Sequence, residues 1–381
     1  MRPVRSPRPV AAFKPGLSKA EGEAARMVLA GGWAGSGIYV RLFERRLADA
    51  AGVPYAHAVT SATAALHLAL KVLEVEGGEV ITTPLTSPAT NHAILHNRAV
   101  PVFCDVEEKT GNLDPLRVEQ ALGPRTRAII AVHFNGLPAE MNALRALARR
   151  RGVPLVEDAG AALPLGGLYR GRPLGSLGDI AAFSFSRKIF STLDGGAVLH
   201  RRRAWSGRLS RLRNLGQKEA GGAEERSRGL TEAGFPYRLN DVAAAMGLSQ
   251  FERWEKTSAR LAKLDRMFRA GLAGPAVLEF PAAPAHSVRS LSCFPVRVRS
   301  GKRALREFLR SREIMTDDWI YPNHLFPLYK PWRRRLPAAE KLARELVYLP
   351  FYPGLTDAEA GRVLDAVREF ARGGRTRKPS A

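Results

Sequence analysis

The sequence is poor in cysteine, in acidic residues and in long uncharged apolar runs. Only two of its 381 residues are cysteines, Cys104 and Cys293, each in an apolar, strand-like run. Two such cysteines exclude a disulfide framework and a cysteine-based zinc site, and we expect no metal. No stretch reaches the roughly 18 apolar residues of a membrane span, and the segment MRPVRSPRPVAAFKPG lacks the apolar core of a signal peptide. We therefore expect a cytoplasmic protein with no membrane partner.

The shortage of acidic residues leaves a formal net charge of +23, from 59 Lys and Arg against 36 Asp and Glu. Such a charge favours binding to a polyanion such as nucleic acid. The basic residues are spread over the chain, however, and no helix-turn-helix, zinc-knuckle or aromatic-basic motif accompanies them. We interpret the charge as a solvated surface that also suits an anionic small substrate. Nucleic-acid binding that weakens steeply with salt is the alternative.

The length and the local composition predict four segments. A chain of 381 residues exceeds the size at which a single core stops growing, so a large domain and a smaller one are expected. We place a large domain at residues 17–255 and a smaller C-terminal α+β domain at residues 256–371. A Pro/Arg-rich arm at residues 1–16 and a basic tail at residues 372–381 are both expected to be too polar to pack.

Between the arm and the tail, helical and strand-like patterns alternate. Short apolar runs rich in Val, Ile and Phe predict strands buried on both faces, and amphipathic stretches such as residues 138–150 predict the helices that connect them. This pattern is typical of an α/β fold with a mostly parallel central sheet. A helix from Asn240 to Glu255, opening with an asparagine cap, is expected to lead towards the second domain. The predicted strands cover residues 79–83, 99–106, 128–134, 153–157, 179–185 and 196–200.

Two residues of this region suggest chemistry. Asp158 ends a predicted buried strand, the place where open α/β sheets bind ligands. Lys188 follows the next strand in a Ser-rich loop that ends in Asp194-Gly195-Gly196, so the two side chains could face one pocket. A third element, Thr60 to Thr63, opens a helix whose free N–H groups could bind phosphate. Each feature alone has an ordinary interpretation as a solvated lysine, a strand-end carboxylate or a helix cap; only their combination suggests a ligand site.

Over about Gly16 to Gly373 the sequence resembles the nucleotide-sugar aminotransferases of the DegT/StrS type, which have the fold of type I pyridoxal-5′-phosphate (PLP) enzymes. The resemblance implies a PLP-dependent α/β transferase with a large and a small domain. The motifs that carry it occur in the same order and at similar spacing as in the family. They include TSATAALHLAL, VEDAGAA, GRPLGSLGDIAAFSFSRKIFSTLDGGAVL, GFPYRLNDVAAAMGLSQFERW and LPFYPGLTD.

The resemblance implies roles for the residues around the cofactor. Lys188 matches the lysine that forms the internal Schiff base, and a shielded amine near a cationic cofactor loses proton affinity, as a nucleophile and general base requires. Asp158 matches the carboxylate that keeps the pyridine nitrogen protonated. Ala62 with Thr63, and Ser184, match the residues that bind the cofactor phosphate. Ala161 stands at a cofactor-binding position where the family usually has Gln.

Two further residues lie on the substrate side in the family. His324 falls in a motif near the substrate, and Arg238 in a segment that reaches the site of a partner subunit. The resemblance therefore implies a homodimer that uses PLP to transfer an amino group, from L-glutamate as expected donor, to a keto group of a nucleotide-linked sugar. Such reactions belong to aminosugar biosynthesis for polysaccharides or antibiotics.

The sequence departs from the family pattern around the cofactor. Ser87 falls where an aromatic residue stacks on the ring, and Ala62 replaces a Gly. Pro236 replaces an Asn that reaches the neighbouring subunit's phosphate, and Leu193 replaces a Gly. Two residues separate the FSF motif from Lys188, where the family usually has three. Loss of an aromatic stack alone costs about 1 kcal/mol, so we expect weaker PLP binding or an altered pocket.

These departures keep two alternatives open. A PLP-dependent sugar dehydratase of the same fold would eliminate a hydroxyl, but such relatives typically carry His where this chain has Lys188. A catalytically weakened family member with a binding or regulatory role would show no change in turnover when Lys188 is replaced by Ala.

Overall fold

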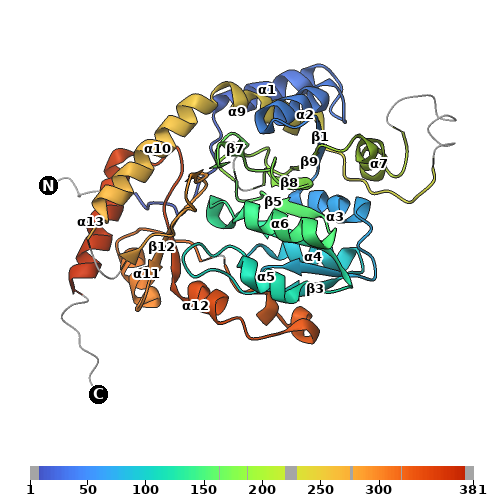
Figure 1. The fold of residues 1–381 in the computed structure, drawn as a ribbon. Coiled ribbons are helices and arrows are strands. Elements are labelled where there is room, and N and C mark those ends of the chain that lie inside the picture. The colour runs from blue at the N-terminus through green and yellow to red at the C-terminus, as the bar shows by residue number, and fades with distance from the viewer. Residues whose placement is uncertain are drawn as a thin grey trace.

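A computed structural model describes residues 8–162, 164–186, 188–218, 230–274, 278–318 and 320–373. Within these ranges the chain forms a large domain around a mostly parallel sheet and a smaller α+β domain that includes the C-terminal helix (Figure 1). This arrangement confirms the predicted α/β class.

The central sheet of the described chain has seven strands. They are β1 (Tyr55–Val59), β2 (Glu79–Thr82), β3 (Val100–Phe103), β4 (Thr126–Val132), β5 (Leu155–Asp158), β8 (Ile180–Ser184) and β9 (Gly196–His200), in the order β1-β9-β8-β5-β4-β2-β3. The pairs β3–β2, β2–β4, β4–β5 and β5–β8 are parallel, whereas β9 is antiparallel to β8 and β1. The parallel strands therefore all end at one edge, where β5 delivers Asp158.

Helices cover both faces of this sheet. Because side chains alternate along a strand, Ile129 and Ala131 of β4 join one apolar cluster, while Ala128, Ile130 and Val132 join another. The first cluster includes side chains of α2 (Ile38–Ala51), α5 (Pro115–Ala121) and α6 (Met141–Arg151), and the second includes side chains of α3 (Ala62–Val72), α4 (Pro88–His96) and α7 (Arg203–Arg213). Burial on both faces explains why the strands read as continuous apolar runs.

The smaller domain packs helices against a short antiparallel sheet. Its strands β10 (Leu278–Glu279), β12 (Phe294–Val298) and β13 (Leu346–Leu349) pair in the order β10-β12-β13. The long helix α10 descends from the top of the large domain to α13 at the edge of the molecule (Figure 1). The helices of this domain are α10 (Trp254–Gly271), α11 (Lys302–Ser311), α12 (Pro337–Glu345) and α13 (Asp357–Gly373).

The helix that leads into this domain is shorter than predicted. Asn240 caps α9 (Asp241–Glu252) by accepting a hydrogen bond from the Ala243 N–H at 2.8 Å, as expected. The predicted end at Glu255 is wrong, because Arg253 leaves the helical conformation and α10 begins at Trp254. The Arg253 guanidinium is bound by Glu21 and by the Gly16 carbonyl, which holds the chain at this bend.

The N-terminal arm is not wholly unpacked. Val10 is fully buried; its N–H donates to the Glu313 carbonyl at 2.8 Å and its carbonyl accepts from the Met315 N–H at 2.9 Å. The Gly16 N–H donates a hydrogen bond to the Ile189 carbonyl at 3.1 Å. The prediction that this arm is too polar to pack is therefore wrong for residues 10–13 and for Gly16, whereas Arg8, Pro9, Lys14 and Pro15 are exposed. Residues 1–7 lie outside the described residues. Of the predicted tail, the first residues extend α13 and residues 374–381 are not described.

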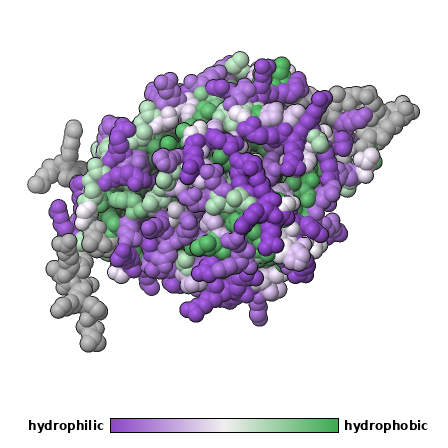
Figure 2. Space-filling view, in the orientation of Figure 1, coloured by the Kyte–Doolittle hydropathy of each residue, from purple (hydrophilic) through white to green (hydrophobic). Residues whose placement is uncertain are grey.

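The remaining elements border the site region. Three short strands, β6 (Leu168–Tyr169), β7 (Arg172–Pro173) and β11 (Ser287–Val288), form a small sheet that joins the two domains, and α1 (Lys19–Ala30) packs on α9. Figure 2 shows hydrophilic side chains distributed over the whole of the displayed face. No helix of the described ranges combines the length and apolarity needed to cross a membrane.

Candidate active site

Asp158 is held at the carboxyl end of β5 by two hydrogen bonds. Thr90 Oγ1 of α4 donates to its Oδ2 at 2.6 Å, and the Gly160 N–H donates to its Oδ1 at 2.9 Å. Thr90 is itself fixed by a 2.7 Å hydrogen bond with the Thr86 hydroxyl. Only 6% of Asp158 is exposed. The carboxylate is therefore preorganised at the sheet edge predicted for ligand binding.

Lys188 lies in the loop between β8 and β9 and lines two neighbouring cavities. Burial lowers the pKa of its amine, an effect opposed by the nearby Cys293 thiol and the Asp158 carboxylate. A lowered pKa leaves more of the amine neutral, the form that acts as a nucleophile or accepts a proton. The structure thus brings the predicted lysine and carboxylate to one place.

The first cavity, of about 410 Å³, gathers all six predicted cofactor-binding residues. Asp158, Lys188, Thr63 and Ser184 all line it. Its other described lining residues include Ser61, Ala62, Ser87, Thr90, Asn135, Gly160, Ala161, Ser186 and Asp194. Five separate segments of the large domain therefore converge on this cavity.

One end of this cavity is suited to a phosphate. Ala62 and Thr63 form the first turn of α3, whose N–H groups have no intrahelical acceptor. Ser61 caps the helix by accepting from the Ala64 N–H at 3.1 Å. Gly196 passes so close that an added Cβ would lie 2.5 Å from the Ser61 backbone, so only glycine permits this approach. An exposed helix start beside hydroxyl groups is a site for phosphate.

The second cavity, of about 420 Å³, begins where the first ends. Ser87, Ala161, Ser186 and Lys188 line both. The other described residues of the second cavity come from the arm and the small domain, namely Ala12, Phe13, Ser292, Cys293, Asp317, Tyr348, Leu349 and Phe351. Lys188 therefore stands at a junction between a cofactor-sized cavity and a second cavity at the domain interface.

The residues around Lys188 fit the cofactor that the resemblance implies. Asp158 offers a carboxylate to a ring nitrogen, the α3 start and Ser184 offer donors to a phosphate, and Lys188 offers an amine to an aldehyde. The departures are also visible. Ser87 and Ala161 present small side chains at the junction, and Leu193 adopts φ +70°, the left-handed conformation that favours glycine.

Arg238 and His324 are not brought to either cavity. Arg238 is exposed, pairs with Val59 through its backbone and donates a hydrogen bond to Asn214 Oδ1. His324 is fully buried; its Nε2 lies 3.3 Å from Glu340, and burial lowers its pKa. Their predicted substrate roles stay predictions, and that of Arg238 requires a second subunit.

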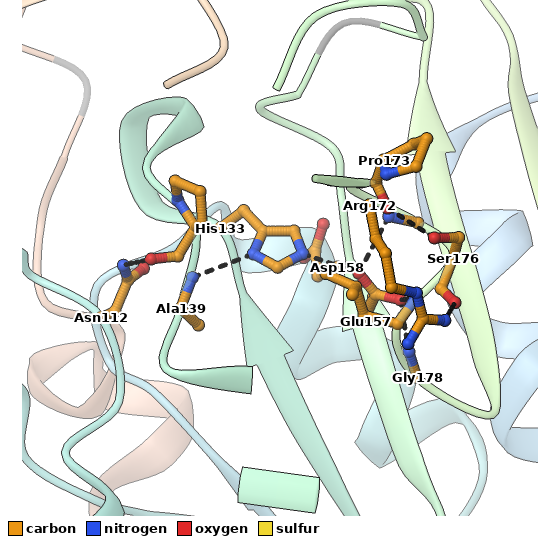
Figure 3. Close-up of polar contacts among 12 residues, drawn as sticks. Asn112, His133, Ala139, Glu157, Asp158, Arg172, Pro173, Ser176 and Gly178 are labelled. Carbon is orange, nitrogen blue, oxygen red and sulfur yellow. Dashed lines mark hydrogen bonds and ion pairs between the residues drawn. The ribbon is translucent and has the colours of Figure 1, made fainter. Parts of the chain in front are cut away.

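Sequence reasoning missed a buried pair behind Asp158. His133 Nδ1 accepts from the Ala139 N–H at 3.2 Å, so its Nε2 carries the proton and donates to Glu157 at 2.8 Å (Figure 3). Glu157 also accepts from the N–H groups of Gly175, Leu177 and Gly178. These hydrogen bonds keep the pKa of Glu157 lowered despite complete burial. The pair anchors the loop before β8 beneath the site; the alternating pattern of β5 could have suggested that Glu157 faces away from Asp158.

Among the described residues, no group of three or more His, Cys, Asp or Glu side chains could hold a metal ion. Both cysteines are free.

Comparison with known proteins gives a consistent result. The model of the DegT/DnrJ/EryC1/StrS aminotransferase family matches residues 15–368. The spore coat polysaccharide biosynthesis protein SpsC of Bacillus subtilis (strain 168) is 31% identical over 376 residues, covering 94% of this chain and 96% of SpsC.

Solved structures agree with this match. DesV of S. venezuelae, determined in complex with a ketimine intermediate, superimposes with a TM-score of 0.88 at 33% identity, covering 96% of this chain and 99% of DesV. The PLP form of Spr1654 from Streptococcus pneumoniae, named a putative sugar aminotransferase, shares the fold with a TM-score of 0.89 at 24% identity. The match covers 96% of this chain and 99% of Spr1654.

Proposed function

The chain belongs to the DegT/DnrJ/EryC1/StrS aminotransferase family and is a PLP-dependent enzyme, and from this premise we propose that it transfers the amino group of L-glutamate to the keto group of a nucleotide-linked sugar. The observation that carries the proposal is the convergence of Lys188, Asp158 and Thr63 on one cavity that meets a second cavity at Lys188. The first cavity takes the cofactor and the second takes the two substrates in turn.

Each residue of the first cavity has a separate role in the two half-reactions. When bound, PLP is an electron sink for the carbanion that forms on loss of the substrate's α-proton. Asp158 would hold a proton on the ring nitrogen, and Ala62, Thr63 and Ser184 would hold the phosphate. Lys188 Nζ would serve as the base that accepts the α-proton of the substrate and then, as the acid, donates it to the cofactor carbon that receives the amino group. Burial lowers the pKa of Lys188, which increases the neutral fraction of the amine.

Two further proposals concern the assembly and the compartment. A homodimer would bring Arg238 of one subunit towards the site of the other. Exposed apolar residues of α1, of α2 and of the loop between them provide a contact surface, among them Met27, Trp33 and Ile38. The free thiols of both cysteines suit the reducing cytoplasm.

A spectroscopic experiment tests the proposed function. Purified protein mixed with PLP should develop the absorbance band of lysine-bound cofactor, and L-glutamate should bleach it. Lys188→Ala should lack the band and lose turnover by about 10²- to 10⁴-fold, whereas Lys256→Ala, on the solvent side of α10, should behave as wild type. Absence of any band at saturating PLP would refute the proposal.

A further inference from the structure

One carboxylate of the second cavity has no role in the chemistry described above. Asp317 lines this cavity together with Lys188 and comes from the segment that follows α11. Two backbone hydrogen bonds with Tyr348 fix its main chain. The Asp317 N–H donates to the Tyr348 carbonyl at 3.1 Å, and the Tyr348 N–H donates to the Asp317 carbonyl at 3.2 Å. Its Oδ1 accepts from the Asp318 N–H at 2.8 Å. The carboxylate is therefore held in place on a rigid wall of the cavity.

The neighbouring carboxylate shows a contrast. Asp318 is neutralised outside the cavity by Lys302 at 2.6 Å and by Arg306 at 2.8 Å. Asp317 forms no ion pair with any residue that the structure describes. The chain has 59 basic and 36 acidic residues, and yet this half-buried carboxylate has no cation as partner among the residues that the structure describes. Its Oδ2 is available to a ligand.

The surroundings of Asp317 indicate what that ligand offers. Ser87, Ser186 and Ser292 contribute hydroxyl groups to the same cavity, while Phe13, Leu349 and Phe351 contribute apolar surface. A carboxylate accepts hydrogen bonds from hydroxyl or ammonium groups and repels another carboxylate. Hydroxyls beside apolar surface suit a sugar ring, which has polar edges and apolar faces.

We propose that Asp317 is a specificity-determining residue that binds a hydroxyl or amino group of the acceptor sugar, so that the acceptor is a neutral or amino-bearing ketosugar and not a keto-uronate. This inference rests on the proposed function, since it concerns the second cavity as the substrate site. It also implies that glutamate, whose carboxylates Asp317 would repel, is bound in spite of this residue and not through it.

Removal of the Asp317 charge should therefore slow the reaction of the sugar but not that of glutamate. Asp317→Asn keeps the shape of the side chain and can still accept from the Asp318 N–H. We expect kcat/KM for a neutral nucleotide-linked ketosugar to fall by about 10- to 100-fold, because a hydrogen bond to a charged group is lost. The glutamate half-reaction, followed by bleaching of the cofactor band in single turnover, should be unchanged or faster. Structural damage would slow both.

Asp318→Asn is the matched control. It removes the neighbouring carboxylate that points to Lys302 and Arg306, and we expect the ratio of sugar to glutamate efficiency to stay within about twofold of wild type, because exposed ion pairs contribute little. The keto-uronate counterpart of the same sugar supplies the second readout. Wild type should use it at least about tenfold less efficiently than the neutral sugar, and Asp317→Asn should narrow that difference.

The outcomes separate the two proposals. If wild type shows no glutamate-dependent bleaching, the proposed function fails and the role of Asp317 falls with it. If bleaching is intact but the keto-uronate is used as well as the neutral sugar, or neither sugar is used, the role of Asp317 is refuted. It is equally refuted if Asp317→Asn leaves the sugar-to-glutamate ratio unchanged or lowers both half-reactions together.

Discussion

The hydroxyl of Thr90 reaches Asp158 from a different element, 68 positions away in the sequence. Thr90→Val keeps the shape of the side chain but leaves Asp158 Oδ2 without this donor. We expect the dissociation constant of PLP to rise by about tenfold, because one hydrogen bond to a charged group contributes on the order of 1.5 kcal/mol. Titration of the cofactor absorbance measures it. Thr110→Val, which alters a hydrogen-bonded threonine of another loop, should bind PLP as wild type does; equal affinity in both variants would contradict the prediction.

Ser87 leaves the ring of the cofactor without the aromatic neighbour usual in the family. Ser87→Tyr should tighten PLP binding by about fivefold, since an aromatic stack contributes about 1 kcal/mol. Because Ser87 also lines the second cavity, the same change should raise KM for the sugar. Ser87→Leu fills similar space without an aromatic face. If Ser87→Leu improves the affinity for PLP as much as Ser87→Tyr does, aromatic stacking is not the cause of the tighter binding.

Single residues differed in how far the sequence could place them. Lys188, Asp158 and Thr63 were recognisable because each has a local signal, namely a glycine-rich loop, a strand end or a helix start. Thr90 and Asp317 had none, since their importance comes only from contacts with distant segments. Arg238 and His324 were assigned by resemblance alone, and neither lines the described cavities.

At the scale of elements, β9 carries a buried histidine that makes stability depend on pH. Burial lowers the pKa of His200 to about 4, against 6.5 in the unfolded chain. As the pH falls, the imidazole of His200 is protonated in the unfolded chain before it is protonated in the folded protein. The contribution of neutral His200 to the free energy of unfolding is therefore fully present above about pH 6.5 and is lost towards about pH 4. When the pH is lowered from about 7.5 to about 5, this residue should account for a fall of roughly 2 kcal/mol in the free energy of unfolding.

His200→Phe tests this contribution while preserving the ring that stacks on His57 and Tyr55. Urea unfolding at the two pH values should show a smaller fall in the free energy of unfolding than in wild type. His286→Asn is the control, because this exposed residue at φ +58° can be replaced by asparagine without strain. An unchanged pH dependence in His200→Phe would show that other groups, such as His67 with its pKa of about 4, dominate.

Elements with strong periodicity were predictable and their ends were not. Six of the seven strands of the described sheet follow from continuous apolar runs, whereas β1 (Tyr55–Val59) was not predicted. The bend at Arg253 was missed because the helical pattern continues across it. The contacts that hold it come from Glu21, 232 residues earlier, and from the Gly16 carbonyl. The pairing of Val10 with the small domain was missed because the short apolar run of residues 10–13, within a Pro/Arg-rich segment, has no strand or helix period.

At the scale of the whole molecule, length and alternation predicted two domains, and we propose the boundary near residues 255–256 on the basis of the bend that precedes α10. The fold class is fixed by patterns spread over the entire chain, which is why it was predictable. The way in which Ala12, Phe13 and Asp317 meet Lys188 depends on how the arm and the small domain pack against the large one. No local pattern encodes that packing.

The whole molecule also presents apolar side chains that a second copy would cover. They lie within residues 27–42, on α1, on α2 and on the loop between them: Met27 (57% exposed), Leu29 (61%), Trp33 (63%), Ile38 (57%) and Leu42 (48%). Such a concentration is typical of a protein interface. The double variant Trp33→Asp/Ile38→Asp would place two charges in that interface. Since desolvating an unpaired charge is unfavourable, we expect the dimer dissociation constant to rise by at least about 100-fold.

Light scattering after gel filtration measures this change. Wild type should have twice the 41.6 kDa mass of the chain and the double variant that of one chain. Leu116→Asp, which changes a leucine of α5 that is 68% exposed outside the segment, should remain dimeric. If Arg238 reaches the partner's site, the double variant should also lose sugar turnover while keeping its fold, because the site then lacks the residue supplied by the second subunit. A monomer with full turnover would refute the shared site, and a double variant that stays dimeric would place the interface elsewhere.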